Sequence, residues 1–452
     1  MKIIIGGAGN VAKSIVSYLS RSDNDIIVVD GNEANLHEME REWDIQTVYG
    51  SVSHPDVLQK AGAENADLLI AVTGHDEVNM IACQAAYSLF NLPRKIARID
   101  SRVYTKARWG NLFGDANMPV DLIVSPEYEI ADYILNLLKI PGVSGVYPLA
   151  EKKLQMLSFR CPKKCPLVQI PLDHLEEAAP ELKVHPVAIV RNNRGFLPQG
   201  DDVFKVGDEI YLLAQSEQLD AIVHGFGLNR KAGEKIVIFG GNQIAEYLAE
   251  AIEADDNILG CTIIDENADT AKDLAEHLNN TVVLNGPMMS NAVLDEAGME
   301  YADASVAVTG DDKDNIIASM LAKKNGVENT VSLMNSRSYS ANIVNIGENI
   351  VVDRTAVTIA VLLKELRRVN LNHAYPVGFD FGELWEINVD ENSGLIGNRT
   401  DAIKLPEGVR ILALCCDDET FFGRGEQVIA AGERLLVLVT SAAIRKAEKI
   451  FG

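Results

Sequence analysis

The sequence lacks the features that would make the protein a membrane-spanning, secreted or nucleic-acid-binding one. No stretch approaches the about 20 uninterrupted apolar residues that a membrane-spanning helix needs. The start, MKIIIGGAG, has too short an apolar core and no small-residue cleavage site for a secretory signal. No run rich in lysine and arginine occurs, and the formal net charge of -24 argues against nucleic acid as a partner. We therefore expect a cytoplasmic protein that does not itself enter the membrane.

Cysteine is scarce, and its spacing completes no metal site. The chain has six cysteines among its 452 residues. Cys161 and Cys165 lie in CPKKC, a spacing that suits a metal or redox pair, but no second pair and no nearby histidine completes a zinc site. Cys415 and Cys416 lie in the apolar segment RILALCC and are expected to be reduced core thiols. We expect no metal.

What the sequence does contain is an internal duplication. IIIGGAGNVAKSIVSYL near the start returns as IVIFGGNQIAEYLAEAI, and ADLLIAVTGHDEVNMIACQAA returns as ADASVAVTGDDKDNIIASMLA. Asp30 matches Asp265 at an offset of 235 residues (265 − 30), and Asn79 matches Asn315 at an offset of 236 (315 − 79). A near-constant offset over this length indicates gene duplication, so the two halves should share one fold.

Each half begins with strands that alternate with helices. KIIIGG, DIIVVD, QTVYG, DLLIAVTG and RKIARID are expected strands, and NVAKSIVSYLS has its apolar residues at helical spacing. This alternation predicts an α/β fold with a doubly wound parallel sheet. A second, smaller α+β part follows in each half, with expected strands such as LVQIPL and EIYLLA. In this part, GFLPQGDDVFKVGDEIYLLA of the first half returns as TFFGRGEQVIAAGERLLVLV in the second half. Gly200 and Gly207 match Gly425 and Gly432.

We therefore expect four domains, in which each Rossmann-like domain is followed by a small α+β domain. The expected ranges of the four domains are 1–136, 137–229, 230–371 and 372–452. Linkers are expected around Pro141, in the segment before Lys235 and around Pro376, because each of these stretches has proline, glycine or a charge cluster.

The first glycine-rich loop has the pattern of a dinucleotide site. It is G-x-G-x-x-A after a strand and at the start of a helix, and its residues are Gly7, Ala8, Gly9, Asn10, Val11 and Ala12. Gly7 permits a tight turn, Gly9 lets a pyrophosphate approach the backbone, and the helix start offers free N–H groups. Asp30 ends the next strand, where its carboxylate can bind both ribose hydroxyls. Because that carboxylate would repel a 2′-phosphate, NAD or another adenosine nucleotide is favoured over NADP.

The second loop departs from this pattern. In Gly240-Gly241-Asn242-Gln243-Ile244-Ala245, Asn242 stands where the close-approach glycine should be. We expect its side chain to crowd a pyrophosphate, and we expect this position to need φ and ψ values that suit glycine better. Asp265 is retained, so a ribose site is chemically possible. The second site is therefore predicted to be weak, empty or specific for a smaller ligand.

No residue set predicts catalysis. A dehydrogenase needs a proton donor or acceptor beside the nicotinamide, and the candidate in VTGHDEVN is His75, which the second copy replaces by Asp311. Asp76 and Glu77 fit a helix start better than an acid/base pair. The small domains have no concentrated set of His, Lys, Ser or Cys. We therefore expect no catalytic residues, although an NAD-dependent oxidoreductase stays open as an alternative.

With GAGNVA, Asp30, AVTGHDEVNM and YSLFNLPRKIARI in this order within a duplicated plan, the chain resembles the peripheral regulatory subunits of Trk-type potassium uptake systems, the TrkA family. Its larger domains resemble the RCK (or KTN) domains that regulate potassium conductance. The resemblance implies a non-catalytic subunit that binds NAD(H), or alternatively ATP/ADP. It implies assembly into a dimer or tetramer ring at the inner face of the membrane, where the bound nucleotide gates a potassium-translocating Trk/Ktr-type partner. A regulator of a cation exporter with the same fold stays open as a further alternative.

The resemblance also implies site residues. In the first half these are the loop from Gly7 to Ala12, Asp30 at the ribose, the turn of Thr73 and Gly74, and Arg98 at the nucleotide phosphate. The family often has an acid where Ser51 follows Gly50, so contacts to the base or second ribose depart from the family pattern here. In the second half Thr309 matches Thr73, but Leu333 stands where Arg98 would align. The second half has lost both the loop glycine and the arginine. We therefore predict one competent nucleotide site per chain, in the first half.

Overall fold

A computed structural model describes most of the chain. The residues that it describes are 1–20, 24–105, 107–114, 117–140, 142–228, 233–256, 258–335, 350–367, 369–378, 381–416 and 419–452. They form two compact units, one made of Met1–Ile130 with Val357–Ile359 and the other of Ala131–Ala356 with Ala360–Gly452. Within the described ranges, no helix has the length and apolar character needed to cross a membrane.

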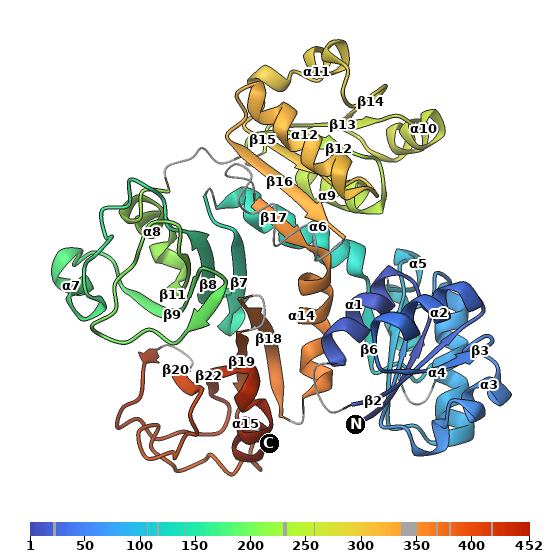
Figure 1. The fold of residues 1–452 in the computed structure, drawn as a ribbon, viewed down its shortest axis with the longest axis horizontal. Coiled ribbons are helices and arrows are strands. Elements are labelled where there is room, and N and C mark those ends of the chain that lie inside the picture. Colours follow the sequence, from blue (N-terminus) through green and yellow to red (C-terminus); the bar gives the residue numbers. More distant parts are fainter. Residues whose placement is uncertain are drawn as a thin grey trace. The chain divides into compact units, whose positions relative to one another are not determined.

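The first unit contains a six-stranded parallel sheet (Figure 1). Its strands are β1 (Lys2–Gly6), β2 (Asp25–Asp30), β3 (Gln46–Tyr49), β4 (Leu68–Ala71), β5 (Arg94–Arg98) and β6 (Leu122–Val124). Their order in the sheet is β3-β2-β1-β4-β5-β6, and Ile4 of β1 pairs with Ile27 on one side and Leu69 on the other. The order reverses between β1 and β4, and ligands of such sheets bind outside the carboxyl ends of the strands at this switch point.

Helices connect these strands. They are α1 (Asn10–Leu19), α2 (Glu33–Glu42), α3 (Pro55–Lys60), α4 (Asp76–Phe90), α5 (Arg102–Thr105) and α6 (Pro126–Lys139), the last of which continues into the second unit. In α1 the residues with helical spacing in the sequence, among them Ile15 and Val16, are buried. The isoleucines of β1 have no exposed surface, as expected for a strand covered on both faces.

The second unit repeats the parallel sheet. Its strands are β12 (Lys235–Phe239), β13 (Gly260–Asp265), β14 (Val282–Asn285), β15 (Ala304–Ala307), β16 (Asn329–Met334) and β17 (Ile350–Asp353), in the order β14-β13-β12-β15-β16-β17. Its helices are α9 (Gln243–Glu253), α10 (Ala268–His277), α11 (Asn291–Glu296), α12 (Asp312–Lys324) and α14 (Arg354–Leu366). The identical strand order in the two copies confirms the duplicated Rossmann-like fold predicted from the sequence.

Two small antiparallel sheets complete the second unit. One has the order β10-β9-β11-β8-β7, and the other has the order β18-β19-β22-β20-β21. The first comprises β7 (Gly145–Leu149), β8 (Leu154–Arg160), β9 (Val184–Arg191), β10 (Arg194–Phe196) and β11 (Glu209–Gln215), with α7 (Leu175–Ala178) and α8 (Leu219–Gly225). The second comprises β18 (Leu371–Val377), β19 (Gly382–Asn388), β20 (Val409–Cys415), β21 (Thr420–Phe422) and β22 (Arg434–Thr440), with α15 (Ile444–Phe451). Gly207 and Gly432 have φ values of 86° and 88°, which explains why both copies keep glycine there.

Two local expectations were wrong. Pro376 lies inside β18 and not in a linker; β18 is an edge strand, where a residue without an N–H group is tolerated. LVQIPL, residues 167–172, forms turns instead of a strand, and Gln169 within it has a φ of 64° that a strand does not allow.

The four-domain division stays a prediction. Pro141 and residues 229–232, where two linkers were expected, lie outside the described residues. Helix α6 runs across the expected boundary at residue 136.

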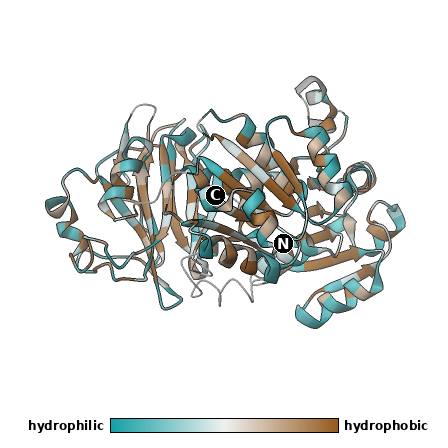
Figure 2. Cartoon of the chain, turned by 90° about the horizontal axis from the view of Figure 1, so that it is seen from above, coloured by the Kyte–Doolittle hydropathy of each residue, from teal (hydrophilic) through white to brown (hydrophobic). Residues whose placement is uncertain are grey.

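The two small sheets share one hydrophobic core. Buried residues of both copies, among them Leu213 of β11 and Leu436 of β22, belong to a single cluster. The Tyr375 hydroxyl donates to the carbonyl of Pro148 at 3.0 Å, across 227 positions of sequence. Figure 2 shows hydrophobic colour concentrated on strands, while many helices carry hydrophilic faces. Because one core serves both sheets, the two small domains should respond together to a packing defect.

We expect Leu436→Ala to destabilise both small domains, although the substitution lies in only one. The side chain is fully buried, so its truncation should cost about 2–5 kcal/mol. Hydrogen exchange by mass spectrometry should show faster exchange in β8 and β9 as well as in β20 and β22. Val206→Ala, at a half-exposed position, is the control and should leave exchange unchanged. Faster exchange confined to β20 and β22 would contradict the shared core.

Candidate nucleotide-binding site

The predicted first-site residues collect at the carboxyl ends of β1, β2, β4 and β5, beside the switch point of the first sheet. Gly7 and Gly9 follow β1, Asp30 ends β2, Thr73 and Gly74 follow β4, and Arg98 ends β5. Ser51 lies at the end of β3, where its hydroxyl is 2.9 Å from that of Ser53. The topology therefore brings all the strand-end residues proposed from the sequence to one edge of one sheet.

The two glycines of the first loop are favoured for different structural reasons. Gly7 has a φ of 109°, and a Cβ there would lie 2.9 Å from the Val72 carbonyl oxygen, so both backbone and space require glycine. Gly9 has an ordinary extended backbone, with φ −78° and ψ −173°, and a Cβ there would meet nothing within 4 Å. The absent side chain at Gly9 thus leaves open space in front of α1.

The start of α1 is suited to an anion. Gly9 is the N-cap residue, and because it has no side chain it makes no capping hydrogen bond to the first N–H groups of the helix. Asn10 is exposed at this end, whereas Ala8 and Val11 are buried beneath the loop. Uncapped N–H groups and the positive end of the helix dipole together favour a phosphate.

Asp30 connects the loop to the second strand. Its Oδ2 accepts from the N–H of Ala8 at 2.7 Å, and its Oδ1 accepts from the N–H of Asn32 at 2.7 Å. Each carboxylate oxygen can accept more than one hydrogen bond, so this arrangement leaves acceptor capacity for hydroxyl groups. The carboxylate is thereby oriented beside the loop, where a ribose of a phosphate-bound nucleotide would lie.

The turn after β4 is held by Asn79, a residue that sequence reasoning used only as a marker of the repeat. Its Oδ1 accepts from the N–H of Thr73 at 2.9 Å and from the Thr73 hydroxyl at 2.7 Å. Its Nδ2 donates to the carbonyls of Thr73 at 3.1 Å and Arg98 at 2.9 Å. The fully buried amide thus joins the ends of β4 and β5 and leaves Gly74 exposed at the edge.

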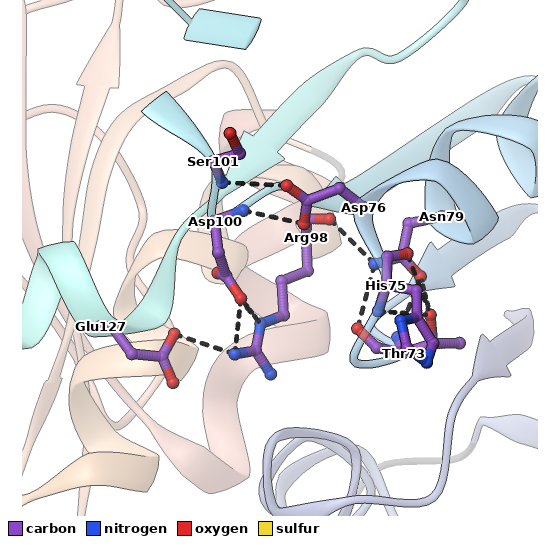
Figure 3. A network of polar contacts seen from close by, with 8 residues as sticks. All are labelled: Thr73, His75, Asp76, Asn79, Arg98, Asp100, Ser101 and Glu127. Carbon is purple, nitrogen blue, oxygen red and sulfur yellow. Dashed lines mark hydrogen bonds and ion pairs between the residues drawn. The ribbon is translucent and has the colours of Figure 1, made fainter. Parts of the chain in front are cut away.

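Arg98 lies at the expected strand end, with its guanidinium between two carboxylates (Figure 3). Its Nη2 is 2.7 Å from Asp100 and 3.2 Å from Glu127, and 17% of its side chain is exposed. Burial acts to lower the pKa of Arg98, but the hydrogen bond to Asp100 and the nearby carboxylates raise it above its usual value. The contact with a phosphate implied by the resemblance stays a prediction, and it would have to compete with these two acids.

Asp76 has a role that differs from the expected helix cap. It lies in the first turn of α4, but its carboxylate accepts from the N–H groups of Asp100 at 3.0 Å and Ser101 at 2.9 Å (Figure 3). The Glu77 carboxylate, also in the first turn of α4, accepts from the Tyr104 hydroxyl at 3.0 Å. Both acids therefore hold the segment after β5 in place.

The second copy has the same scaffold at its strand ends. Gly240 has a φ of 97°, and Asp265 Oδ2 accepts from the N–H of Gly241 at 2.6 Å. Asn315 Oδ1 accepts from the N–H of Thr309 at 2.8 Å, and its Nδ2 donates to the carbonyl of Leu333 at 2.9 Å. Leu333 therefore takes the backbone place of Arg98, as the alignment of the two halves predicted.

Asn242 changes the loop for a reason that the sequence argument missed. Its backbone, with φ −83° and ψ −178°, matches that of Gly9, so the expectation that this position needs a glycine conformation was wrong. Its side-chain oxygen instead accepts from the N–H groups of Ile244 at 3.0 Å and Ala245 at 3.2 Å, and its amide donates to the carbonyl of Val308. The Asn242 carboxamide thus caps α9, and it occupies the N–H groups that an anion would use. Gln243 begins the helix on its exposed side.

These features define a class of protein: one with two Rossmann-like domains, the fold of nucleotide-binding domains, and two small α+β domains. The TrkA-N domain model matches residues 3–126 and 236–354, and the TrkA-C domain model matches residues 156–227 and 384–452. The chain belongs to the TrkA family.

Curated relatives match over the whole chain. A protein of Azorhizobium caulinodans named Trk system potassium uptake protein TrkA is 33% identical over 100% of this chain and 98% of its own length. A protein of the same name from Halomonas elongata is 34% identical, with the same two coverages.

Solved structures share the fold at lower identity. The GsuK channel bound to NAD is 17% identical, with a TM-score of 0.61 over 99% of this chain and 78% of that one. GsuK bound to ADP is 16% identical, with a TM-score of 0.51 over 81% of this chain and 68% of that one. At this level of identity the likeness concerns the fold alone.

Substitutions at the two loop glycines should separate an effect on folding from an effect on binding. We expect Gly7→Ala to destabilise the first domain by about 1–3 kcal/mol, because the new methyl group meets a carbonyl in a strained backbone. Gly9→Ala should change stability by less than about 0.5 kcal/mol, because its methyl group enters open space. Gly9→Asp should retain the fold but weaken NAD binding at least tenfold, because it places a negative charge before α1. Thermal denaturation and calorimetry measure the two effects, and undiminished NAD binding by Gly9→Asp would contradict the phosphate position.

Proposed function

We propose that this protein is the nucleotide-sensing regulatory subunit of a Trk-type potassium uptake system. The observation that carries the proposal is the contrast between its two loops: α1 begins at an uncapped glycine, whereas the Asn242 side chain caps α9. A nucleotide site in one copy, with no acid/base pair assigned beside it, suits a sensor. The names of the relatives supply potassium uptake as the process that it serves.

The proposed ligand is NAD(H), with ATP/ADP as the alternative. Gly7, Gly9 and the first turn of α1 would hold the phosphates, Asp30 the ribose hydroxyls, and Arg98 a phosphate oxygen. The relation to GsuK structures bound to NAD and to ADP supports a ligand of this class. The second domain, with the Asn242 cap and Leu333, would bind nucleotide weakly or not at all, which gives one principal site per chain.

Regulation would follow from differential affinity. A nucleotide shifts a conformational equilibrium only if it binds two states of the assembly unequally. A tenfold shift requires a difference of about 1.4 kcal/mol, the size of one or two charge-assisted hydrogen bonds. We propose a homo-oligomer, a dimer or tetramer ring, at the inner face of the membrane. There it would act on the potassium-translocating subunit through the four domains expected from the sequence.

Potassium flux tests the assignment of the first site. In cells or liposomes with the membrane partner, we expect Asp30→Ala and Arg98→Ala to weaken the nucleotide response at least tenfold, because each removes a direct ligand contact. Asp265→Ala is the matched control, since Asp265 makes the same loop contact in the second copy. It should leave the response unchanged.

Two outcomes would contradict this assignment. One is an unchanged response in both first-site variants, and the other is an equal loss in Asp265→Ala. NADH turnover by the purified protein with a hydroxy- or keto-acid would favour an oxidoreductase instead. Nucleotide-dependent cation export, with no effect on uptake, would favour a regulator of an exporter.

If the Asn242 side chain closes the second site by capping α9, removing this side chain should allow the second Rossmann-like domain to bind nucleotide. We expect Asn242→Gly, made together with Gly9→Asp to silence the first site, to produce a measurable weak affinity for NAD or ADP. The substitution frees the N–H groups of Ile244 and Ala245 and should cost only a few tenths of a kcal/mol in helix stability. Calorimetry measures the binding, with Gly9→Asp alone as the control. No binding by the double variant would show that the cap is not what closes the second site.

A further inference from the structure

The guanidinium of Arg98 makes two ion pairs that use different parts of the group (Figure 3). Asp100 takes one edge, because Nε donates to its Oδ1 at 3.1 Å and to its Oδ2 at 2.9 Å, and Nη2 lies 2.7 Å from Oδ2. The donors that are left, of the five in a guanidinium, are the second N–H of Nη2 and both N–H groups of Nη1. Glu127 is the acid paired with this end, with its Oε2 3.2 Å from Nη2. Nη1 itself donates no hydrogen bond to any residue in the described ranges.

The two acids are held beside Arg98 in different ways. Asp100 follows Arg98 by two residues on the same segment, and its backbone N–H donates to the Asp76 carboxylate at 3.0 Å, so its place is set locally. Glu127 comes from another element, the first turn of α6, where it is buried. A carboxylate in the first turn of a helix is stabilised by the helix dipole, so Glu127 keeps one source of stabilisation when Arg98 leaves it. Of the two contacts, the one to Glu127 is therefore the easier to give up.

The strand registers identify the counterpart of Glu127 in the second copy. In the first sheet the last residue of β6 pairs with Arg98, and in the second sheet Val352 of β17 pairs with Leu333. The chain continues from both strands directly into a helix, α6 in the first copy and α14 in the second. Three positions beyond the paired residue, Glu127 of the first copy therefore corresponds to Thr355 of the second.

The second copy replaces the three charged side chains as a set. Each has a neutral counterpart, namely Leu333 for Arg98, Asn335 for Asp100 and Thr355 for Glu127. The backbone contact of this edge is nevertheless retained, since Asp312 accepts from the N–H of Asn335 at 2.8 Å. The fold of the edge therefore does not require the ion pairs. They are present in the copy whose helix start is open and absent from the copy whose helix start is capped, which indicates a role with the ligand.

We propose that a phosphate of the bound nucleotide takes the place of Glu127 at Arg98, while Asp100 stays and orients the guanidinium. This inference rests on the proposed function, because it takes Arg98 as a phosphate ligand. Phosphate and carboxylate oxygens both fit the paired N–H groups of a guanidinium, so they compete for the same donors. Two anions at one end of the group also repel each other, so phosphate and Glu127 exclude one another there. Nucleotide binding therefore breaks an ion pair that joins β5 to α6.

The exchange at Arg98 would act on the helix that leads out of the first unit. Helix α6 runs from Pro126 to Lys139, and its residues from Ala131 onward belong to the second unit. Without nucleotide the start of this helix is tied to the end of β5, and with nucleotide it is released. The two states thus differ in a contact that the ligand itself replaces, which is the differential interaction that a regulatory ligand needs.

Calorimetry with NAD on the full-length protein separates the roles of the two acids. Glu127→Gln keeps the size of the side chain and removes the competing charge, so NAD should bind about three- to tenfold more tightly. Asp100→Asn should weaken binding about tenfold, because the guanidinium loses the acid that orients it. Glu129→Gln is the matched control: it removes a charge from the same turn of α6, from a residue with no ion pair to Arg98, and affinity should stay within about twofold.

Hydrogen exchange by mass spectrometry follows the contact itself and needs no substitution. In the wild type, saturating NAD should speed exchange at least about twofold in the peptide that holds the first turns of α6, because the helix start loses its tie to β5. In Glu127→Gln this peptide should exchange faster already without NAD, and NAD should change it no further.

The possible failures of this inference and of the proposed function are distinguishable. If NAD binding depends on Arg98 but Glu127→Gln binds no more tightly, or if NAD leaves exchange at the start of α6 unchanged or slower, this inference is overturned and the proposed function stands. Equal tightening by Glu127→Gln, Asp100→Asn and Glu129→Gln would show general charge repulsion and would overturn it as well. If Arg98→Ala binds NAD as tightly as the wild type, the phosphate contact of the proposed function fails, and this inference fails with it.

Discussion

The strand-end edge of each large domain, where the nucleotide site of the first copy is proposed, depends on one buried amide side chain, Asn79 in the first copy and Asn315 in the second. A strand that ends in the interior leaves N–H and carbonyl groups that must find partners, because an unsatisfied buried group costs about 1–3 kcal/mol. The side chain of Asn79 accepts a hydrogen bond from the N–H of Thr73 and donates one to the Thr73 carbonyl. It donates a further hydrogen bond to the carbonyl of Arg98. One side chain thereby sets the spacing between the ends of β4 and β5, and with it the direction in which the Thr73–Gly74 turn and the Arg98 side chain leave the sheet.

Duplication provides an internal comparison within the chain. The contacts that both copies share, those of Asn79 and Asn315 and those of Asp30 and Asp265, belong to the scaffold, because the second copy keeps them beside a capped helix. The differences concern ligand chemistry. The first copy presents open N–H groups, whereas the second satisfies the same groups with its own carboxamide. The Asn242 cap belongs to the same chain, so it forms without the entropy cost of bringing two molecules together. A phosphate does incur this cost, so it could displace the cap only if its own contacts were enthalpically stronger than those of the cap.

The sequence predicts the sheets well because the signals are local. Apolar runs and helical spacing give the strands and α1, and the constant offset gives the second copy. Prediction from the sequence fails where a long-range contact or a single backbone dihedral angle determines the local structure. The Asn242 amide donates to Val308, 66 residues away, and no motif anticipates that contact. The glycine pattern also conflates two requirements, since Gly7 is needed for its backbone and Gly9 only for space. LVQIPL has the composition of a strand, but Gln169 adopts a left-handed conformation.

The two small domains respond together because their sheets share one core, so a packing change in either domain reaches the other. The residues proposed to hold the nucleotide lie instead at strand ends of the first parallel sheet, in the other compact unit. Coupling between two sites is reciprocal, so a partner that binds the small domains and changes nucleotide affinity by some factor would have its own affinity changed by the nucleotide by the same factor. The shared core therefore gives a partner of either small domain one common element to act on.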